Sequence, residues 1–404
     1  MNHHKQVPLI GLAALMRMAY SGVDLGPLGA ELVARAERSP DDANALMDLS
    51  TLLQLRGHRE IALATQLQAL GMQQVYSPPT ATGEAAIRVL AIMAPGDLMS
   101  NTPLEFLLET SDVALDILYV GAGLPSPGAL PEHDVLFIAV GESEQTLPLL
   151  KELENVVATW PRPVLNQPGR IAGMSRDAAC ALLKSTPGVL MPATLRVGRA
   201  MLQDIGEGGT GISSVLEDGA FPIIVRPVDS HAGQGLAKLD DAAAIATYLQ
   251  TMPQAEFYIS RFIDYRAPDG LFRKYRIVLI DGRPFLCHLA ISRHWMIHYL
   301  NAGMAESAEK RAEEARGMAS FDTDFAPRHA AALREIYTRA GLDYLGIDCA
   351  ESQDGRLLIF EADSNMIVHA MDPLDLFPYK QVQMQKVFAA FRAMLADAAR
   401  RQPG

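Results

Sequence analysis

Three carboxylates lie close together in one short segment near the C-terminal end of the chain. Asp354-Gly355 separates two apolar runs there, which predicts a β-hairpin with a two-residue turn. With that turn Asp348 faces Glu361, and Asp363 lies two residues further along the same face. Like charges opposed within apolar strands are destabilising unless something compensates them. Mg²⁺ would do so, because it takes oxygen ligands and keeps open positions for a phosphate.

Two other interpretations of these acids remain open. They could form a solvated rim of the hairpin, or each could be paired with an arginine. A turn longer than two residues would shift the register, and Asp348 would then no longer face Glu361.

Basic residues and a glycine loop could supply a phosphate site. The loop 229–235 follows a buried strand that carries Arg226, and its two glycines would let backbone N–H groups approach an anion. An ordinary hairpin loop is the alternative. Residues 261–293 hold seven Lys or Arg against three Asp. Within them Lys274 and Arg276 share one face of a predicted strand, which could equally be a solvated sheet face.

Histidines form the third group of candidates. His294 and His298 are four residues apart, so a helix would place both on one face. Their surroundings do not match a zinc motif. The segment is either a packed or surface aromatic stretch, or the wall of a substrate pocket in which His298 or Arg293 contacts a substrate carboxylate. His369, near the metal end, is a candidate general base for an incoming amine.

The elements that must position these groups differ along the chain. Residues 1–80 have the helical period, with one helix expected to begin at Ser39-Pro40. A helix–Gly57–helix pair there resembles a tetratricopeptide-type repeat. This region is either a helical cap packed on the rest of the chain or a docking module for a partner. Between residues 85 and 166, continuous apolar runs alternate with helices and predict a small α/β domain with a parallel sheet.

Composition narrows the function classes. The chain has 404 residues, of which 49% are hydrophobic and 20% charged, so a globular protein of several domains is expected. A net charge of −12 argues against general binding of nucleic acid or of an anionic membrane. Cys180, Cys287 and Cys349 are widely spaced and form neither a disulfide framework nor a zinc pattern. No uncharged stretch reaches membrane length, so we predict a soluble cytoplasmic protein.

Six motifs follow one another in the order of a known superfamily. From about residue 85 to residue 400 the chain resembles the ATP-grasp superfamily, and within it the ribosomal-protein glutamate ligases and glutathione synthetases. The motifs that carry the resemblance are Arg162–Asn166, Pro192–Thr194, Pro222–Pro227 with His231–Gly235, Phe257–Ile263, Arg273–Arg276, and Asp348 with Glu361–Asp363.

The resemblance implies a multidomain α/β and α+β protein with an ATP-grasp fold. A pre-ATP-grasp α/β domain would span 85–166, and a subdomain with the glycine loop would span 167–255. A C-terminal subdomain with the metal site would span 256–404. The all-helical, tetratricopeptide-like region 1–80 precedes them and lies outside the resemblance.

The resemblance also implies an activity, that of an ATP-dependent carboxylate–amine ligase. Such an enzyme forms an amide bond through an acyl phosphate and releases ADP and phosphate. ATP and Mg²⁺, with two ions expected, would be the cofactors. An amino acid or a peptide would be the substrate, and a protein or peptide partner could dock on the N-terminal helices.

Individual residues take roles from the matching motifs. Arg276 and Lys274 would be catalytic. The implied ATP-binding residues are Arg176, Arg226, Ser230, His231, Gly233, Gly235, Ser260, Phe262 and Asp264. The implied metal ligands are Asp348, Glu361, Asp363 and Asn365. The expected substrate-binding residues are Arg293, His294, His298 and His369.

The chain departs from the family pattern at three positions. Arg226 stands where the family usually has a lysine, and Arg176 occupies the region of a second lysine. Asp363 stands where the family has asparagine, with Asn365 two residues further on. Two alternatives therefore remain, a small-molecule kinase on this fold and a non-catalytic nucleotide-binding scaffold. Neither the substrates nor the oligomeric state can be read from the sequence.

Overall fold

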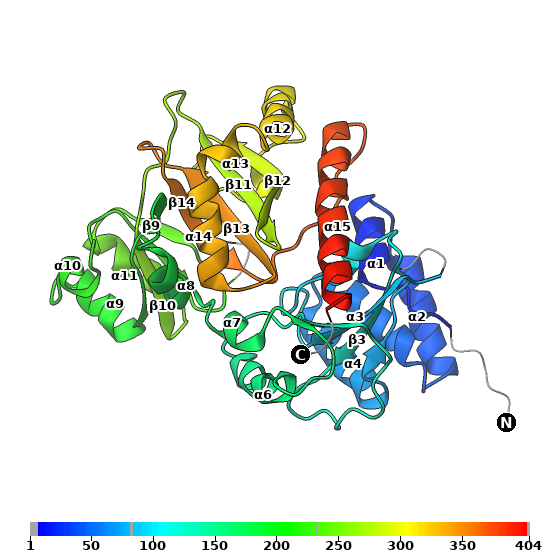
Figure 1. The fold of residues 1–404 in the computed structure, drawn as a ribbon. Helices are drawn as coiled ribbons and strands as arrows, with labels where there is room; N and C mark the ends of the chain where they lie inside the picture. The colour runs from blue at the N-terminus through cyan, green and yellow to red at the C-terminus, as the bar shows by residue number, and fades with distance from the viewer. Residues whose placement is uncertain (1–6, 81–83, 231–232, 402–404) are drawn as a thin grey trace. The chain divides into compact units, whose positions relative to one another are not determined.

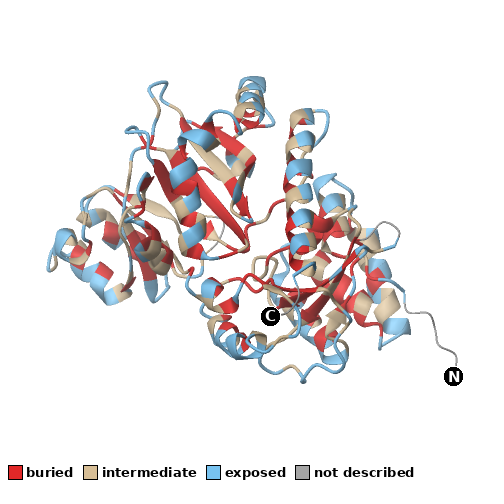
Figure 2. Ribbon diagram, viewed as in Figure 1, coloured by how far each residue is buried: buried red, intermediate tan, exposed pale blue. Residues whose placement is uncertain are grey.

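The computed structural model describes residues 7–80, 84–230 and 233–401. These residues form two compact units. Unit 1 comprises residues 1–172, 342–344 and 364–404, and unit 2 comprises residues 173–341 and 345–363. Both units have strands that are largely buried, whereas the helices bury one side and expose the other (Figures 1 and 2).

Four helices begin unit 1. They are α1 (Leu12–Tyr20), α2 (Gly26–Arg38), α3 (Ala43–Leu55) and α4 (Arg59–Met72). The predicted helix start at Ser39 is wrong, because Asp42 caps α3 by accepting a hydrogen bond from the amide of Ala45 at 2.9 Å. Gly57, with a φ of 81°, makes the break between α3 and α4.

A five-stranded sheet forms the centre of unit 1. Its strands, in the order β1-β3-β2-β4-β5, are β1 (Val75–Tyr76), β2 (Ile87–Met93), β3 (Val113–Tyr119), β4 (Val135–Ile138) and β5 (Val164–Leu165). Strands β2 to β5 pair in parallel, as predicted, and β1 joins β3 antiparallel. The accompanying helices are α5 (Leu104–Leu108), α6 (Leu147–Val157), α7 (Pro168–Ala172) and α15 (Pro378–Ala399).

The N-terminal helices share a core with this α/β part. Ala13 and Met16 of α1 pack against Phe106 of α5 and Met371. The Glu105 carboxylate of α5 accepts a hydrogen bond from the amide of Ala13 at 3.0 Å. These contacts fit the interpretation of residues 1–80 as a helical cap packed on the rest of the chain.

Unit 2 begins with an antiparallel sheet of order β7-β10-β8-β9. Its strands are β7 (Thr194–Gly198), β8 (Ile223–Pro227), β9 (Ala237–Leu239) and β10 (Glu256–Arg261). One face packs against α9 (Arg199–Gly206) and α11 (Ala242–Thr251), through a core that includes Leu202, Ile245 and Phe257. The short helix α10 (Ile212–Val215) lies between α9 and β8 in sequence, and α8 (Arg176–Leu183) precedes this sheet in the chain.

A second sheet of unit 2 has the order β12-β11-β13-β14-β6. Its strands are β6 (Val189–Leu190), β11 (Phe272–Ile280), β12 (Arg283–Ser292), β13 (Tyr344–Glu351) and β14 (Leu357–Asp363). The connecting helices are η1 (Tyr299–Asn301), α12 (Ala308–Ser320), α13 (Phe325–Arg328) and α14 (Ala330–Ala340). The ring of Tyr275 on β11 packs against Phe325 of α13, with centroids 4.5 Å apart. Lys274 and Arg276 therefore lie on the opposite face of β11.

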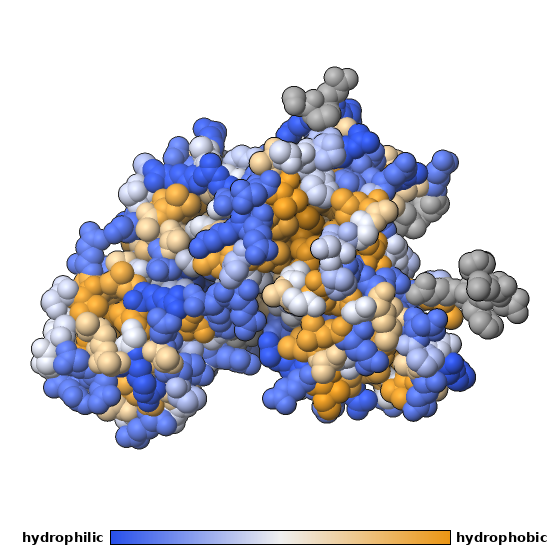
Figure 3. Space-filling view, turned by 90° about the horizontal axis from the view of Figure 1, so that it is seen from below, coloured by the Kyte–Doolittle hydropathy of each residue, from blue (hydrophilic) through white to orange (hydrophobic). Residues whose placement is uncertain are grey.

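None of the helices in the described ranges is long and apolar enough to cross a bilayer. On the face shown in Figure 3, hydrophobic residues reach the surface in patches separated by hydrophilic ones. The most exposed large hydrophobic side chains come from different elements, namely Ile61, Leu300, Leu374 and Val382.

Two leucines of α4 give a matched test of the packing of the N-terminal helices. Leu70 is fully buried, whereas Leu67 is 52% exposed. We expect Leu70→Ala to lower the free energy of unfolding of unit 1 by about 2–5 kcal/mol, because it leaves a cavity in a shared core. Leu67→Ala should change it by less than about 0.5 kcal/mol. Urea unfolding followed by circular dichroism measures both, and equal effects would contradict the shared core.

Candidate functional site

The β13–β14 hairpin has a wider turn than predicted. Ser352 pairs with Arg356, and the amide of Gly355 donates to the Ser352 carbonyl at 2.9 Å, so three residues form the turn. The Ser352 hydroxyl donates to Asp354 Oδ1 at 2.6 Å and accepts from the Arg356 amide at 3.0 Å. These side-chain bonds stabilise the wider turn, and the two-residue prediction is wrong.

A β-bulge restores the predicted pairing. Next to the turn the register is shifted by one residue, so that Cys349 faces Ile359. The register shifts back between Cys349 and Asp348, with Phe360 as the extra residue, and Asp348 faces Glu361. Asp363 lies opposite Gly346. The facing carboxylates are therefore confirmed, although through a bulge that the sequence argument did not include.

Asp348 is the most deeply buried charge of the site, with 1% of its surface exposed. Arg276 donates to both carboxylate oxygens, from Nε at 2.8 Å and from Nη2 at 3.0 Å. Lys274 Nζ lies 2.7 Å from Oδ2. Burial alone would raise the pKa of Asp348, but the charges of Arg276 and Lys274 outweigh it and hold that pKa well below its usual range.

Glu361 is compensated by a different pair of cations. Arg176, at the start of α8, forms an ion pair with its Oε1 atom. Burial raises the pKa of Glu361, but the charges of Arg176 and Arg226 together lower it. Burial and the like charge of Arg176 in turn lower the pKa of Arg226 to about 10. In the structure the acids are thus paired with cations, the arrangement that the sequence left as an alternative to a metal.

Arg226 also anchors the start of the glycine loop. Its Nε donates to Ser230 Oγ at 3.2 Å, and its Nη2 donates to the Ser230 carbonyl. Gly235 has a φ of 67°, and a Cβ there would lie 2.7 Å from Pro227 Cδ, so this position requires glycine. Gly233, with a φ of 77°, belongs to the same loop. His231, the remaining candidate of the loop, lies outside the described residues.

The open face of the β7-β10-β8-β9 sheet carries the other expected nucleotide contacts. Ser260 on β10 faces Ile224, which lies two residues before Arg226, so Ser260 and Arg226 share this face. Phe262 follows β10, and its ring packs edge-on against Trp295 with centroids 5.6 Å apart. Asp264 is turned towards solvent and pairs with Arg266 at 3.1 Å.

Lys238 belongs to this face, and the sequence analysis missed it. It lies opposite Ile224 in the β8–β9 pairing, and its Nζ is 5.0 Å from the centre of the Phe262 ring. Nζ also contacts Asp240 Oδ1 at 2.7 Å. Alternation along β9 from Leu239, which faces the core, could have identified Lys238.

Of the predicted substrate-binding residues, His298 lies nearest the cations. Lys274 Nζ donates to the neighbouring Ile297 carbonyl at 3.2 Å. The backbone amide of Asn301 donates to the His298 carbonyl at 3.0 Å, and the His298 amide donates to Asn301 Oδ1 at 3.0 Å. Burial and the charges of Lys274 and Arg276 lower the pKa of His298, which favours the neutral imidazole.

The remaining candidates are placed differently. Arg293 and His294 are exposed, and residues 293–298 form no helix. His369 and Asn365 belong to unit 1. The ring of His369 packs edge-on against Tyr20 at 5.1 Å, and the Asn365 amide donates to the Met99 carbonyl at 2.6 Å.

The oxygen atoms of the facing carboxylates determine whether this site could bind magnesium. No group of three or more His, Cys, Asp or Glu side chains among the described residues is arranged to hold a metal ion. Asp348 and Glu361 nevertheless face each other and offer only oxygen atoms. Two such carboxylates fit Mg²⁺, which commonly takes its other ligands from water and from substrate phosphates.

Solved structures similar to this chain include an ATP-grasp protein and two ligases. One is a RimK domain protein, an ATP-grasp protein from Sphaerobacter thermophilus DSM 20745, with 15% identity over 77% of this chain and 99% of that chain and a TM-score of 0.43. The D-Ala:D-Ser ligase VanG from Enterococcus faecalis is 12% identical over 78% of this chain and all of that chain, with a TM-score of 0.45. A D-alanine–D-alanine ligase from Bacillus anthracis, solved in complex with ATP, is 13% identical over 78% of this chain and 97% of that chain, with a TM-score of 0.39.

No protein-family model matches the sequence, and no curated protein matches it either.

The pairing of Arg276 with Asp348 can be tested through stability. Arg276→Gln should lower the free energy of unfolding by up to about 3 kcal/mol, the lower end for breaking a buried pair, because Lys274 remains beside the carboxylate. Arg266→Gln removes a guanidinium from an exposed pair and should change it by less than about 1 kcal/mol. Thermal and urea unfolding measure both variants. If Arg276→Gln is as stable as Arg266→Gln, the buried charge is compensated by something else.

Proposed function

We propose that this chain is an ATP-dependent carboxylate–amine ligase that forms an amide bond through an acyl phosphate. One observation carries the proposal. In unit 2 four cations, Lys274, Arg276, Arg176 and Arg226, surround two facing carboxylates, Asp348 and Glu361.

The charges of this cluster favour a polyanion. Four cations exceed two carboxylates, so the cluster is positive within a chain whose net charge is −12. A local positive field of this kind concentrates anions in a protein that otherwise repels them. Arginine binds phosphate through a planar fork of donors, which suits Arg176 and Arg226 to the phosphates of ATP.

Asp348 and Glu361 would hold Mg²⁺, and Asp363 and Asn365 are the proposed additional ligands. When bound, the metal would offset the charge of the ATP phosphates and of the two acids. Arg276 and Lys274 would then be released from compensating Asp348. Their donors could bind the oxygens of the transferred phosphoryl group, where negative charge is spread in the transition state.

The nucleotide would lie along the open face of the β7-β10-β8-β9 sheet. Gly233 and Gly235 would bring backbone amides to the phosphates, together with Ser230 and His231 of the same loop. Phe262, Ser260 and Asp264 would contact the base and ribose. Lys238, held over the Phe262 ring, adds a cation to this face.

The reaction would need no nucleophile from the enzyme. A substrate carboxylate attacks the γ-phosphorus of ATP, ADP departs, and an acyl phosphate forms. An amine then attacks the acyl carbon and inorganic phosphate departs. Positioning and stabilisation of negative charge supply the catalysis.

His298 is suited to a substrate oxygen rather than to a phosphate. The lowered pKa of His298 favours the neutral imidazole, in which one ring nitrogen carries a proton. That N–H is a donor that stays uncharged beside Lys274 and Arg276. We assign it to the substrate carboxylate, with Arg293, His294 and His369 as further proposed substrate contacts.

The activity can be tested by following ADP release from Mg·ATP with a pool of amino acids and short peptides, with mass spectrometry on the same samples. A product lighter by one water than the sum of two pool members establishes the ligase. A phosphorylated pool member would instead establish a small-molecule kinase. ATP binding without ADP release across the pool would establish a non-catalytic nucleotide-binding protein.

Asp348→Asn tests the metal assignment. We expect ADP release to fall by roughly 10²-fold or more, because the substitution removes a charge on which metal binding depends. Asp354→Asn, in the exposed turn of the same hairpin, is the control and should retain activity. Circular dichroism checks that both variants fold. Full activity of a folded Asp348→Asn protein would refute the assignment.

Arg276→Lys tests the role of the guanidinium fork. The substitution keeps the charge but loses the paired donors, so kcat should fall by roughly tenfold or more while the KM for ATP changes little. Arg266→Lys, an exposed arginine outside the cluster, should change neither constant. A rise in KM with an unchanged kcat would assign Arg276 to ground-state binding of ATP.

A further inference from the structure

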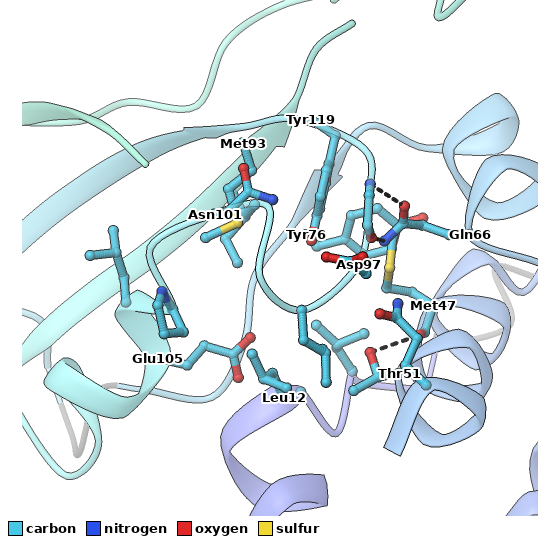
Figure 4. A pocket seen from close by; sticks show the side chains of 18 of the residues that line it. Leu12, Met47, Thr51, Gln66, Tyr76, Met93, Asp97, Asn101, Glu105 and Tyr119 are labelled. Atoms are coloured by element: carbon cyan, nitrogen blue, oxygen red, sulfur yellow. Dashed lines mark hydrogen bonds between the residues drawn. The ribbon is translucent and has the colours of Figure 1, made fainter. Parts of the chain in front are cut away.

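A cavity of about 60 Å³ lies in unit 1, whereas the residues assigned to the phosphates of ATP belong to unit 2. Side chains from α1, α3, α4, α5 and the carboxyl ends of β2 and β3 line it (Figure 4). A cavity needs about 10–15 Å³ to hold one water molecule, so this cavity has room for about four to six groups of the size of a water molecule.

The charges that line this cavity are of one sign. Asp48, Asp97 and Glu105 belong to its lining, and no Lys, Arg or His occurs among the described lining residues. Asp97 already has a counter-charge, because it forms an ion pair with Arg59 at 2.9 Å. The other two carboxylates are buried, with 1% of Asp48 and 7% of Glu105 exposed.

Backbone amides satisfy these two carboxylates only in part. Asp48 accepts from the amides of Ile10 and Gly11 at 2.8 and 3.0 Å, and Glu105 Oε2 accepts from the amide of Ala13 at 3.0 Å. Figure 4 shows the Glu105 side chain extending from α5 towards the first turn of α1 at Leu12. Each carboxylate oxygen can accept two hydrogen bonds, so capacity remains on both acids.

Two further polar atoms of the lining have no partner among the described residues. They are the hydroxyl of Tyr76, a residue that is 1% exposed, and Oε1 of Gln54. Several neighbouring polar side chains already use one donor on the backbone. Thr51, Gln66, Asn101 and Thr102 each donate to a backbone carbonyl.

The described lining of the cavity is therefore rich in acceptors and carries negative but no positive charge. An ammonium group is complementary to it, because it carries three donors, no acceptor and one positive charge. The remaining walls are apolar and include Leu12, Met47, Leu104 and Ile117. We propose that this cavity binds a small aliphatic primary amine in its ammonium form.

The raised pKa values of the two acids agree with the binding of an ammonium group. Burial raises the pKa of Glu105 to about 7 and that of Asp48 to about 6, against the backbone bonds that lower both. The groups acting on them are Arg35 and Asp42 for Asp48, and Asp48 and Glu109 for Glu105. A bound cation would relieve the cost of ionising both acids.

The test uses the full chain and n-propylammonium chloride, which has four heavy atoms. Calorimetric titration at constant ionic strength should show saturable binding, and the ligand should raise the unfolding temperature. Tetramethylammonium, a cation without N–H donors, and 1-propanol, which has no charge, should give neither effect. Binding of potassium chloride with equal affinity would overturn the proposal in favour of an alkali-metal site. The absence of saturable binding would overturn it outright.

Three variants locate the site. Glu105→Gln should weaken propylammonium binding roughly tenfold or more, because a charge-assisted hydrogen bond is lost. Glu109→Gln removes a nearby acid outside the lining and should bind as the parent does. Tyr76→Phe removes only the buried hydroxyl, so it should fold at least as stably as the parent and still bind more weakly. Equal losses in Glu105→Gln and Glu109→Gln, or unchanged binding in Tyr76→Phe, would contradict this location.

Discussion

The arrangement of charges in unit 2 depends on two carboxylates that face each other inside a β-sheet. Asp348 and Glu361 lie on adjacent strands, and Asp348 is almost fully buried. Charges in such a place are tolerated only when opposite charges and donors surround them. Strand β11 supplies Lys274 and Arg276, α8 supplies Arg176, and β8 supplies Arg226. The sheets and helices of unit 2 thus bring three distant parts of the sequence to one pair of acids.

The same compensation explains how the cluster could serve ATP chemistry. A set of cations that is satisfied by carboxylates in the free protein can be transferred to phosphates when a metal takes their place. Under the proposed function the protein would not need to order its donors at the moment of reaction, since β8, β11 and α8 already position them. Arginine keeps its charge on burial better than lysine does. This property suits position 226, where burial removes part of the solvation of the side chain, and it favours arginine over lysine at position 176 as well.

Unit 1 stabilises its buried acids in another way. Asp48 and Glu105 are held by backbone amides around the start of α1 rather than by arginines. That arrangement ties the N-terminal helices to the α/β part and makes them one core, which is why the region behaves as a cap on its sheet. It also leaves the acids without a full counter-charge, and this makes the cavity beside them chemically distinctive.

The sequence by itself determined the local elements and the types of groups at the candidate site. Apolar runs without alternation predicted the parallel sheet, and the face shared by Lys274 and Arg276 follows from the period of a strand. These features depend on neighbours along the chain, which a periodic pattern records.

Tertiary structure decided which charges meet. The turn at residues 353–355 is longer than its Asp-Gly pair predicts, and only a bulge at Phe360 returns Glu361 to Asp348. The pairing of Arg176 with Glu361, and the position of Lys238 over Phe262, join residues far apart in sequence. The cavity between the N-terminal helices and the sheet is likewise invisible in any local pattern. Such contacts result from the packing of whole elements, whose relative positions are set by the burial of all their side chains together.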